Sequence, residues 1–253
     1  MPVPLSELNA QLNDLLQPAQ FDDYCPNGMQ VEGAGTVRTL ISGVTASRAL
    51  INSAIDASAD ALLVHHGYFW RGESQPIIGM KKERIKLLLE NEISLFAYHL
   101  PLDFHAELGN NAQLGKHMGA RLESLIGKPG ELPLVAVGEL EQPTSAADFS
   151  QILTSVLKRP PLWLPGDSRP VRKLGWCTGA AQNYFETAID SGVDAFVTGE
   201  VSEPSAHLAR ESGVHFFAAG HHATERYGVM AVGEFLAQKL DIEHRFINID
   251  NPV

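Results

Sequence analysis

The chain has 253 residues, of which 44% are hydrophobic and 19% are charged, as in globular proteins with one large domain or two modest ones. The formal net charge of -11 argues against a nucleic-acid-binding protein, which needs clustered Lys and Arg. No signal-peptide pattern and no apolar run of ~20 residues is present, so we expect no membrane association. Cys25 and Cys177 lie far apart without a CxxC spacing, which favours reduced thiols in a cytoplasmic protein.

Helical and strand patterns alternate along the first 120 residues. Helices are expected over residues 5–16, 47–59, 81–92 and from about 109, and strands over 40–44, 61–64 and 93–98. Residues 21–30 are expected to form a turn-rich loop. Residues 121–169 are richer in Pro and Gly and contain one expected strand, 134–137, and an amphipathic helix around 149–157. This alternation predicts the α/β fold class.

The pattern of the first half recurs in the last third of the chain. Residues 171–174 (VRKL) echo residues 37–40 (VRTL), and Asp194 echoes Asp60, all at a separation of 134 residues. The next strand and turn match at a separation of 122, which pairs His221 with His99. We therefore expect two similar, pseudo-symmetric α/β lobes from an internal duplication, with a metal site between them. The expected division is a first lobe over 1–120, a short medial segment over 121–169 and a second lobe over 170–253.

Three short apolar runs lead into histidines, and two of these are followed four residues later by a carboxylate. The polar residues concerned are His65 and His66, then His99 with Asp103, then His221 with Glu225. In α/β sheets the ligand site lies at the carboxyl ends of the strands. Imidazoles and carboxylates brought together there suit a divalent metal ion. The sequence therefore predicts a metal centre.

The adjacent histidines cannot easily bind the same ion. Neighbouring residues at the end of a strand point to opposite faces, so His65 and His66 are expected to serve either two ions lying side by side or one ion and a substrate. His65, Asp103 and Glu225 would hold one ion, and His66, His221 and the same Glu225 the other. Ligands of this kind suit Zn, Fe, Mn, Ni or Co. Ions bound in this way lower the pKa of water and provide a nucleophile near neutral pH.

Several assignments stay open at this level. His222 is an alternative to His221, because it lies three residues before Glu225. A His-xxx-Glu pair is also typical of a simple salt bridge at the start of a helix. His99 is expected to act as a general acid or base, or to orient a metal ligand. Glu200, which falls opposite His66 in the repeat, could contact substrate or be a buried charge.

Four further residues are candidates for a structural role or for contacts with substrate. Asn110 and Asn111 are expected to cap a helix rather than to contact substrate. Arg71 and Arg226 are candidate cations that could offset the negative charge of an anionic substrate.

Several motifs, in order along nearly the whole chain, resemble the GTP cyclohydrolase 1 type 2 homologue family, also called NIF-three-like or YbgI-type proteins. They are residues 25–33 (CPNGMQVEG), 64–67 (VHHG), 98–103 (YHLPLD), 109–111 (GNN) and 220–226 (GHHATER). The resemblance implies two similar α/β lobes and a toroidal homohexamer with dinuclear metal sites facing an internal cavity. Carried over by motif, the ligands are His65, His66, Asp103, His221 and Glu225. Long members of the family carry a larger insertion than residues 121–169 provide here.

The family name implies hydrolytic opening of the guanine ring of GTP. We therefore expect a metal-dependent hydrolase with two divalent ions per subunit and a small-molecule substrate, with GTP as the candidate and His99 passing protons. The alternatives are a non-catalytic metal-binding oligomeric scaffold or regulator, and a metal-dependent phosphoesterase that leaves the guanine ring intact.

Overall fold

The computed structural model describes residues 1–253 and divides the chain into two compact units. Unit 1 comprises Met1–Gly109 and Arg226–Asp250, and unit 2 comprises Asn110–Glu225 and Asn251–Val253. Each unit is a mixed α/β structure with its own sheet. The helices all lack the combination of length and apolar character required to cross a bilayer.

Unit 1 is built on a five-stranded sheet with the strand order β13-β4-β5-β6-β2. All neighbouring strands are parallel except β2, which runs antiparallel to β6 at one edge. The strands are β2 (Gly28–Val31), β4 (Thr39–Thr45), β5 (Ala61–His66), β6 (Ser94–Ala97) and β13 (Glu243–Phe246). A separate two-stranded sheet pairs β1 (Val3–Pro4) with β3 (Thr36–Val37).

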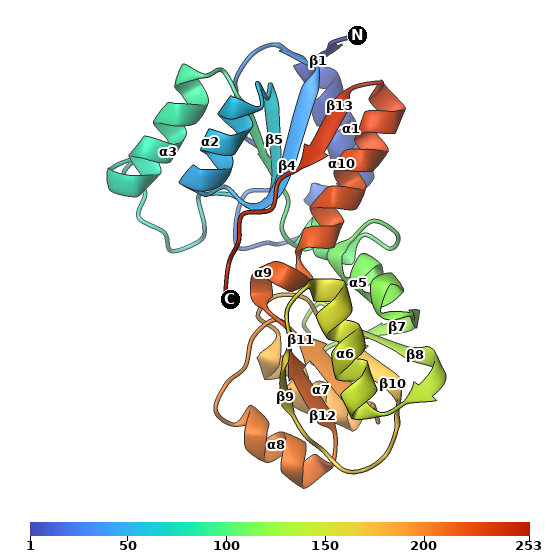
Figure 1. Cartoon of the computed structure of the whole chain (residues 1–253). Helices are drawn as coiled ribbons and strands as arrows, with labels where there is room; N and C mark the ends of the chain where they lie inside the picture. Colours follow the sequence, from blue (N-terminus) through green and yellow to red (C-terminus); the bar gives the residue numbers. More distant parts are fainter. The chain divides into compact units, whose positions relative to one another are not determined.

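Helices cover both faces of this sheet (Figure 1). α1 (Leu5–Leu16) and α10 (Arg226–Leu240) lie on one face, and α2 (Arg48–Asp56) and α3 (Gly79–Glu90) on the other. Alternate residues of β5 enter the two cores: Leu63 belongs to the core of α1 and α10, whereas Leu62 belongs to that of α2 and α3. Burial on both faces explains why the strands read as continuous apolar runs. The short elements η1 (Pro18–Gln20) and α4 (Leu100–Phe104) complete unit 1.

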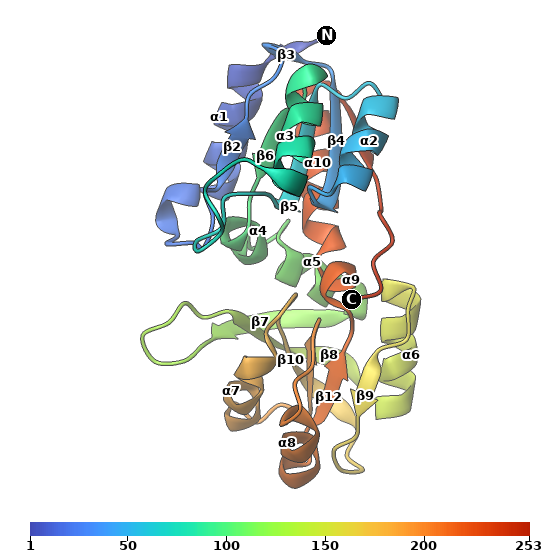
Figure 2. The same cartoon turned by 90° about the vertical axis from the view of Figure 1, so that its left-hand side faces the viewer.

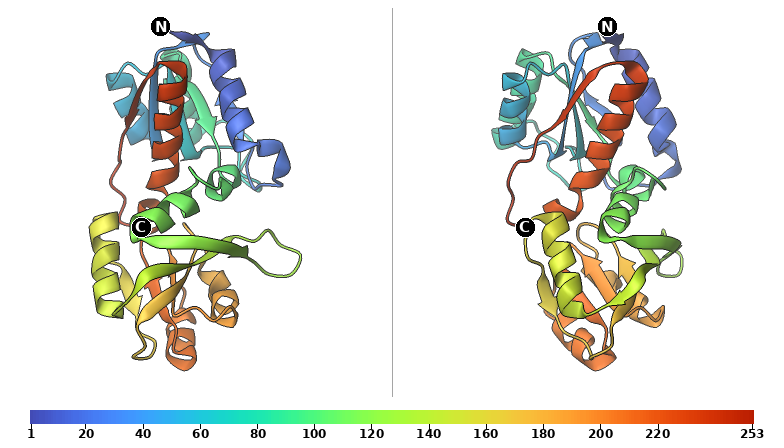
Figure 3. Two further views of the ribbon diagram at one scale, coloured as in Figure 1. Left: turned by 90° about the vertical axis from the view of Figure 1, so that its right-hand side faces the viewer. Right: turned by 45° about the vertical axis from the view of Figure 1, so that its right-hand side comes forward.

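Unit 2 has a six-stranded sheet with the order β7-β8-β10-β11-β12-β9. The three central strands are parallel, and β8 and β9 flank them in the antiparallel direction. The strands are β7 (Ala120–Ile126), β8 (Val135–Thr144), β9 (Leu162–Leu164), β10 (Val171–Trp176), β11 (Ala195–Thr198) and β12 (His215–Ala218). The loop that joins β7 to β8 projects away from the rest of the unit (Figure 3).

The sheet of unit 2 is also covered on both faces (Figure 2). α7 (Phe185–Asp190) and α8 (Ser205–Ser212) lie on one face, where Phe185 contacts Phe216. α6 (Ala146–Leu157) lies on the other, where Phe149 contacts Phe217. The remaining elements are α5 (Asn110–Met118), η2 (Gln182–Tyr184) and α9 (His221–Thr224).

The two units divide the chain differently from the expected lobes 1–120 and 170–253. Residues 121–169 do not form a separate medial segment, because β8 pairs with β10 and β9 pairs with β12 within the sheet of unit 2. The C-terminal α10 and β13 belong to unit 1, because β13 pairs with β4 and forms one edge of the sheet.

Both units contain a β-α-β-α-β run, which is β4-α2-β5-α3-β6 in unit 1 and β10-α7-β11-α8-β12 in unit 2. Their local hydrogen bonding also corresponds. Asp60 Oδ2 accepts hydrogen bonds from the backbone N–H groups of Arg38 and Thr39, at 2.7 and 2.9 Å. The equivalent bonds reach Asp194 Oδ2 from residues 172 and 173, at 3.0 and 2.8 Å. This correspondence has the expected separation of 134 residues.

The strand pairing corrects the second separation by one residue. Ala61 pairs with Ser94 in unit 1, and Ala195, which is 134 residues after Ala61, pairs with His215 in unit 2. His215 is 121 residues after Ser94, so the last strand of the run matches at 121 rather than 122. The separation of 122 at His221 therefore reflects one extra residue in the turn that follows β12.

Candidate metal centre

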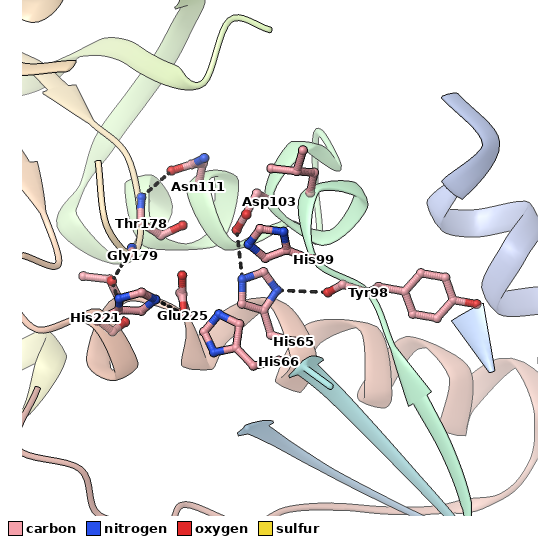
Figure 4. Close-up of polar contacts among 12 residues, drawn as sticks. His65, His66, Tyr98, His99, Asp103, Asn111, Thr178, Gly179, His221 and Glu225 are labelled. Carbon is pink, nitrogen blue, oxygen red and sulfur yellow. Dashed lines mark hydrogen bonds and ion pairs between the residues drawn. The ribbon is translucent and has the colours of Figure 1, made fainter. Parts of the chain in front are cut away.

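Three histidines converge at the carboxyl end of the sheet in unit 1 (Figure 4). His65 and His66 end β5, and His99 follows β6. One ring nitrogen from each lies within 4.8 Å of the others. The ring centroids of His65 and His66 are 4.5 Å apart, so the two rings lie together rather than on opposite faces. The expectation of opposite faces was wrong because His66 closes the strand and strict alternation holds only within a regular strand.

His65 is oriented by the backbone and directed toward Asp103. Its Nδ1 lies 2.9 Å from the carbonyl oxygen of Tyr98. A carbonyl only accepts, so Nδ1 carries the proton and Nε2 presents its lone pair. Nε2 lies 3.6 Å from Asp103 Oδ1, and the His65 side chain is fully buried. Two ligands of one tetrahedral zinc ion, each about 2.0–2.2 Å from it, lie roughly 3.4 Å apart, so this separation suits a shared ion better than a direct hydrogen bond.

The sequence analysis missed Asp23, which orients His99. Asp23 Oδ1 lies 2.8 Å from His99 Nδ1, and Asp23 Oδ2 accepts hydrogen bonds from the Leu100 N–H and from Asn27 Nδ2, both at 2.8 Å. Burial by itself would raise the pKa of Asp23, but the bonds and charge of His99 outweigh it and lower the pKa to about 2. The available signal was its place in the turn-rich loop 21–30, beside the CPNGMQVEG motif.

Cys25 also lies near this group, with its sulfur within 4.8 Å of Asp23 and His99 ligand atoms. Cys25 and Cys177 are both free thiols, and both are buried. Burial, followed by the negative charge of Asp23, raises the pKa of Cys25 to about 12. Metal coordination uses the thiolate, so the imidazoles and carboxylates are the stronger donors here.

In unit 2, His221 meets Glu225. His221 Nε2 lies 3.2 Å from Glu225 Oε2, and the Glu225 side chain is 3% exposed. The pair does not lie on one continuous helix, because α9 ends at Thr224 and α10 begins at Arg226. Of the two adjacent histidines, His221 is the one placed against Glu225. The backbone N–H of His222 donates to the oxygen of Val253 at 3.1 Å.

Glu200 orients His221 from the other side. Its Oε1 lies 2.7 Å from His221 Nδ1, and because a carboxylate only accepts, Nδ1 is the donor. Burial would lower the pKa of His221, but the hydrogen bonds and charges of Glu225 and Glu200 raise it to about 9. The imidazole is therefore protonated at neutral pH and held between two carboxylates. Metal binding releases a ligand proton of this kind, so these residues fit a cation in place of the proton on Nε2.

A close backbone approach holds Glu225 in position. Gly179 has φ 69°, and a Cβ at this residue would clash with Glu225 Oε1. The Gly179 N–H donates to Thr224 Oγ1 at 3.1 Å, and the Thr178 N–H donates to Asn111 Oδ1, also at 3.1 Å (Figure 4). The Asn111 side chain therefore supports the loop that contacts Glu225, a role beyond the expected helix cap.

The two candidate cations have other partners. The Arg71 guanidinium pairs with Asp22 at 2.8 Å on the surface of unit 1. Arg226 lies over the ring of Tyr227, with its Cζ 5.8 Å from the ring centroid. Neither contact assigns these residues to a substrate.

Comparison with known proteins identifies the relatives of this chain. Residues 3–252 match the family described as Duf34/NIF3 (NGG1p interacting factor 3). A Pseudomonas aeruginosa protein named GTP cyclohydrolase 1 type 2 homolog is 51% identical over 252 residues, with 100% of both chains covered. An Escherichia coli K12 protein of the same name is 50% identical over 250 residues, with 98% of both chains covered.

Solved structures show the same relationship along the whole chain. A structure described as protein ybgI, unknown function, has a TM-score of 0.95 at 48% identity, covering 99% of this chain and 100% of that one. The protein TTHA1606 from Thermus thermophilus has a TM-score of 0.87 at 31% identity, again covering 99% of this chain and 100% of that one. The chain belongs to the Duf34/NIF3 family.

Proposed function

We propose that this protein binds two divalent metal ions per subunit and is a metal-dependent hydrolase. The proposed ligands are His65, His66 and Asp103 of unit 1 and His221 and Glu225 of unit 2. Imidazole and carboxylate donors without thiolates suit Zn, Fe, Mn, Ni or Co.

The observation that carries this proposal is an arrangement common to His65 and His221. Nδ1 of His65 donates to the carbonyl oxygen of Tyr98, and Nδ1 of His221 donates to Oε1 of Glu200. In each, Nε2 is then directed toward a buried or largely buried carboxylate. Metal-ligating histidines are held in this way, with the second ring nitrogen bound to a carboxylate or carbonyl.

The chemistry follows from the residues around the proposed centre. Two such ions, when bound, would lower the pKa of water and stabilise negative charge on the reacting group. Asp23 keeps a proton on Nδ1 of His99, so Nε2 of His99 is the atom that accepts or donates a proton during the reaction. Glu225 contributes a carboxylate whose burial strengthens its interaction with a cation.

The name shared by relatives with about half of their residues identical, GTP cyclohydrolase 1 type 2 homolog, supports a guanine nucleotide as the substrate. The proposed reaction is hydrolytic attack at C8 of the guanine ring of GTP.

The test is to load the purified protein with each candidate metal and to incubate it with GTP, other nucleotides and simple phosphoesters. A metal-dependent change in the ultraviolet spectrum of the guanine ring, absent in Glu225→Gln, would support the cyclohydrolase. Phosphate release with an intact ring would instead identify a phosphoesterase. Full metal loading without turnover of any compound would identify a scaffold or regulator.

Two expectations about organisation are also proposals. We propose an internal duplication as the origin of the two units, supported by the matching hydrogen bonds of Asp60 and Asp194. We propose a toroidal homohexamer, supported by the family resemblance. Light scattering tests the second proposal, since six chains of 27.5 kDa are expected and the mass of a single chain would refute it.

A further inference from the structure

Unit 2 contains a cavity of about 390 Å³, and Glu200, which is hydrogen-bonded to His221, lies in its wall. Its walls include Arg159, Glu200, Val201, Gly220 and Val253. Ligand pockets for small molecules begin at about 300 Å³, so this cavity can accept a small organic molecule or part of a larger one.

Arg159 brings an unpaired positive charge to this cavity. It follows α6 and the left-handed Lys158, whose φ is 59°. Nη1 of Arg159 is buried and has no hydrogen-bond partner. A guanidinium remains charged at every accessible pH, and a buried donor without a partner is unfavourable. The unused hydrogen-bonding capacity of Arg159 therefore indicates that a ligand completes this site.

The backbone is shaped to let Arg159 approach. Gly220 has φ 100°, and a Cβ at this position would lie 2.5 Å from Arg159 Nη1. A side chain larger than hydrogen would displace the guanidinium from the wall that it shares with Gly220. The residue before His221 thus permits a cation to lie next to the turn that carries this histidine.

The unpartnered buried atom in the cavity wall is a hydrogen-bond donor, so it calls for an acceptor group on the ligand. Glu200 is the acidic side chain in its wall, and Oε1 of Glu200 accepts a hydrogen bond from Nδ1 of His221 at 2.7 Å. Oε2 of Glu200 lies 3.5 Å from Gln182 Nε2. Because Oε1 of Glu200 is already engaged by His221, Nη1 of Arg159 is the buried polar atom of this wall that has no hydrogen-bond partner.

We infer that this cavity binds an oxyanion, a phosphate or carboxylate group, of a small molecule through Arg159. The planar guanidinium matches either group with two parallel hydrogen bonds. Since Glu200 is shared by the cavity wall and by His221, an anion at Arg159 would place the rest of its molecule toward His221. Its role as the anionic subsite of the substrate rests on the proposed function, whereas anion binding itself does not.

The test measures the binding of inorganic phosphate and of acetate to the full-length protein by calorimetry, with metal content determined on the same samples. Arg159→Gln is expected to raise the Kd for phosphate about 10-fold or more, which corresponds to about 1.4 kcal/mol. Arg210→Gln removes the same charge from an exposed site in unit 2 that does not line the cavity and is expected to leave the Kd unchanged. Equal phosphate affinity in the wild type and Arg159→Gln would overturn the inference.

A second pair of variants avoids any dependence on the folding of Arg159→Gln. Val201→Asp places a negative charge in the cavity wall and is expected to weaken phosphate binding several-fold, whereas the neutral Val201→Asn is not. Weakening of both phosphate and acetate would define a general oxyanion site, and weakening of phosphate alone a phosphate site. Phosphate binding that depends on Arg159 in a protein that binds no metal would uphold this inference while refuting the proposed metal centre.

Discussion

Asp23 Oδ1 accepts a 2.8 Å hydrogen bond from Nδ1 of His99 and thereby fixes the tautomer of that imidazole. The same constraint acts on His65 through the Tyr98 carbonyl and on His221 through Glu200. In all three histidines Nδ1 is the donor to an oxygen, so Nε2 is left for chemistry. The protein therefore sets the orientation of these side chains before a ligand binds.

Asp23→Asn is expected to lower the free energy of unfolding by about 1–3 kcal/mol, because the variant loses charged hydrogen bonds to His99 and Leu100. Its metal content should equal that of the wild type, because Asp23 is outside the proposed ligand set. Urea denaturation and elemental analysis measure the two quantities. The matched control is Asp22→Asn, whose side chain is 91% exposed and whose effect should stay within about 0.5 kcal/mol. Loss of metal from Asp23→Asn would place Asp23 among the ligands instead.

Gly179→Ala should weaken metal binding, because the added Cβ would displace the Glu225 carboxylate. We expect a loss of at least about 10-fold in affinity, as for other changes that misplace a ligand. Gly192→Ala is the control: Gly192 has φ 72°, close to the 69° of Gly179, but no atom lies within 4 Å of its added Cβ. Metal affinity is measured by competition with a chelating dye. If both variants lost metal affinity to the same extent, backbone strain rather than contact with Glu225 would explain the loss.

Glu200→Gln should lower metal affinity about 10- to 100-fold, because the oxygen that orients His221 loses its charge. The substitution should weaken metal binding only by releasing the His221 side chain. We therefore expect the variant protein to remain folded at room temperature. Glu203→Gln changes a neighbouring exposed carboxylate that pairs only with His207 in the structure and is expected to have no effect on affinity. A Glu200→Gln protein that retained wild-type affinity would show that His221 needs no such support.

Much of the candidate site could be predicted because its residues follow buried strands. His65 and His66 end β5, and Asp103 comes in the first turn after β6, so short-range patterns located them. Asp23 could not be found in this way, because its bond to His99 joins residues 76 positions apart in the chain. No periodic pattern encodes such a contact.

The same distinction applies to the fold. The α/β class follows from the local alternation of helices and strands, which the structure confirms in both units. The division of the chain into two units does not follow from this local alternation, because it depends on the pairing of β13 with β4 and of β8 with β10. Strand partners distant in sequence are selected by packing, which a single sequence does not display.

The stability of unit 1 should depend on pH through His244. Its Nε2 lies 2.8 Å from Ser42 Oγ, and burial lowers its pKa from 6.5 to about 4. The unfolded chain therefore binds a proton at higher pH than the folded protein. The stabilising contribution is complete above pH 6.5 and is lost as the pH falls toward 4.

Because His244 is partly exposed, we discount the full shift and expect a loss on the order of 2 kcal/mol across this range. Urea denaturation of the wild type and His244→Gln between pH 7.5 and 4.5 isolates the contribution. His207→Gln, which changes an exposed histidine, should keep the wild-type pH dependence. If His244→Gln also keeps the wild-type pH dependence of stability, His244 is not the group that causes this dependence.

The central proposal is that His65 and Glu225 are both metal ligands, and metal stoichiometry tests it most directly. Wild type, His65→Asn, Glu225→Gln and the exposed control Glu234→Gln would be loaded identically and measured by elemental analysis. We expect two ions per chain in the wild type and in Glu234→Gln, about one in His65→Asn, which loses a ligand of one ion, and fewer than one in Glu225→Gln, which loses a ligand of both. Two ions per chain in Glu225→Gln would contradict this proposal.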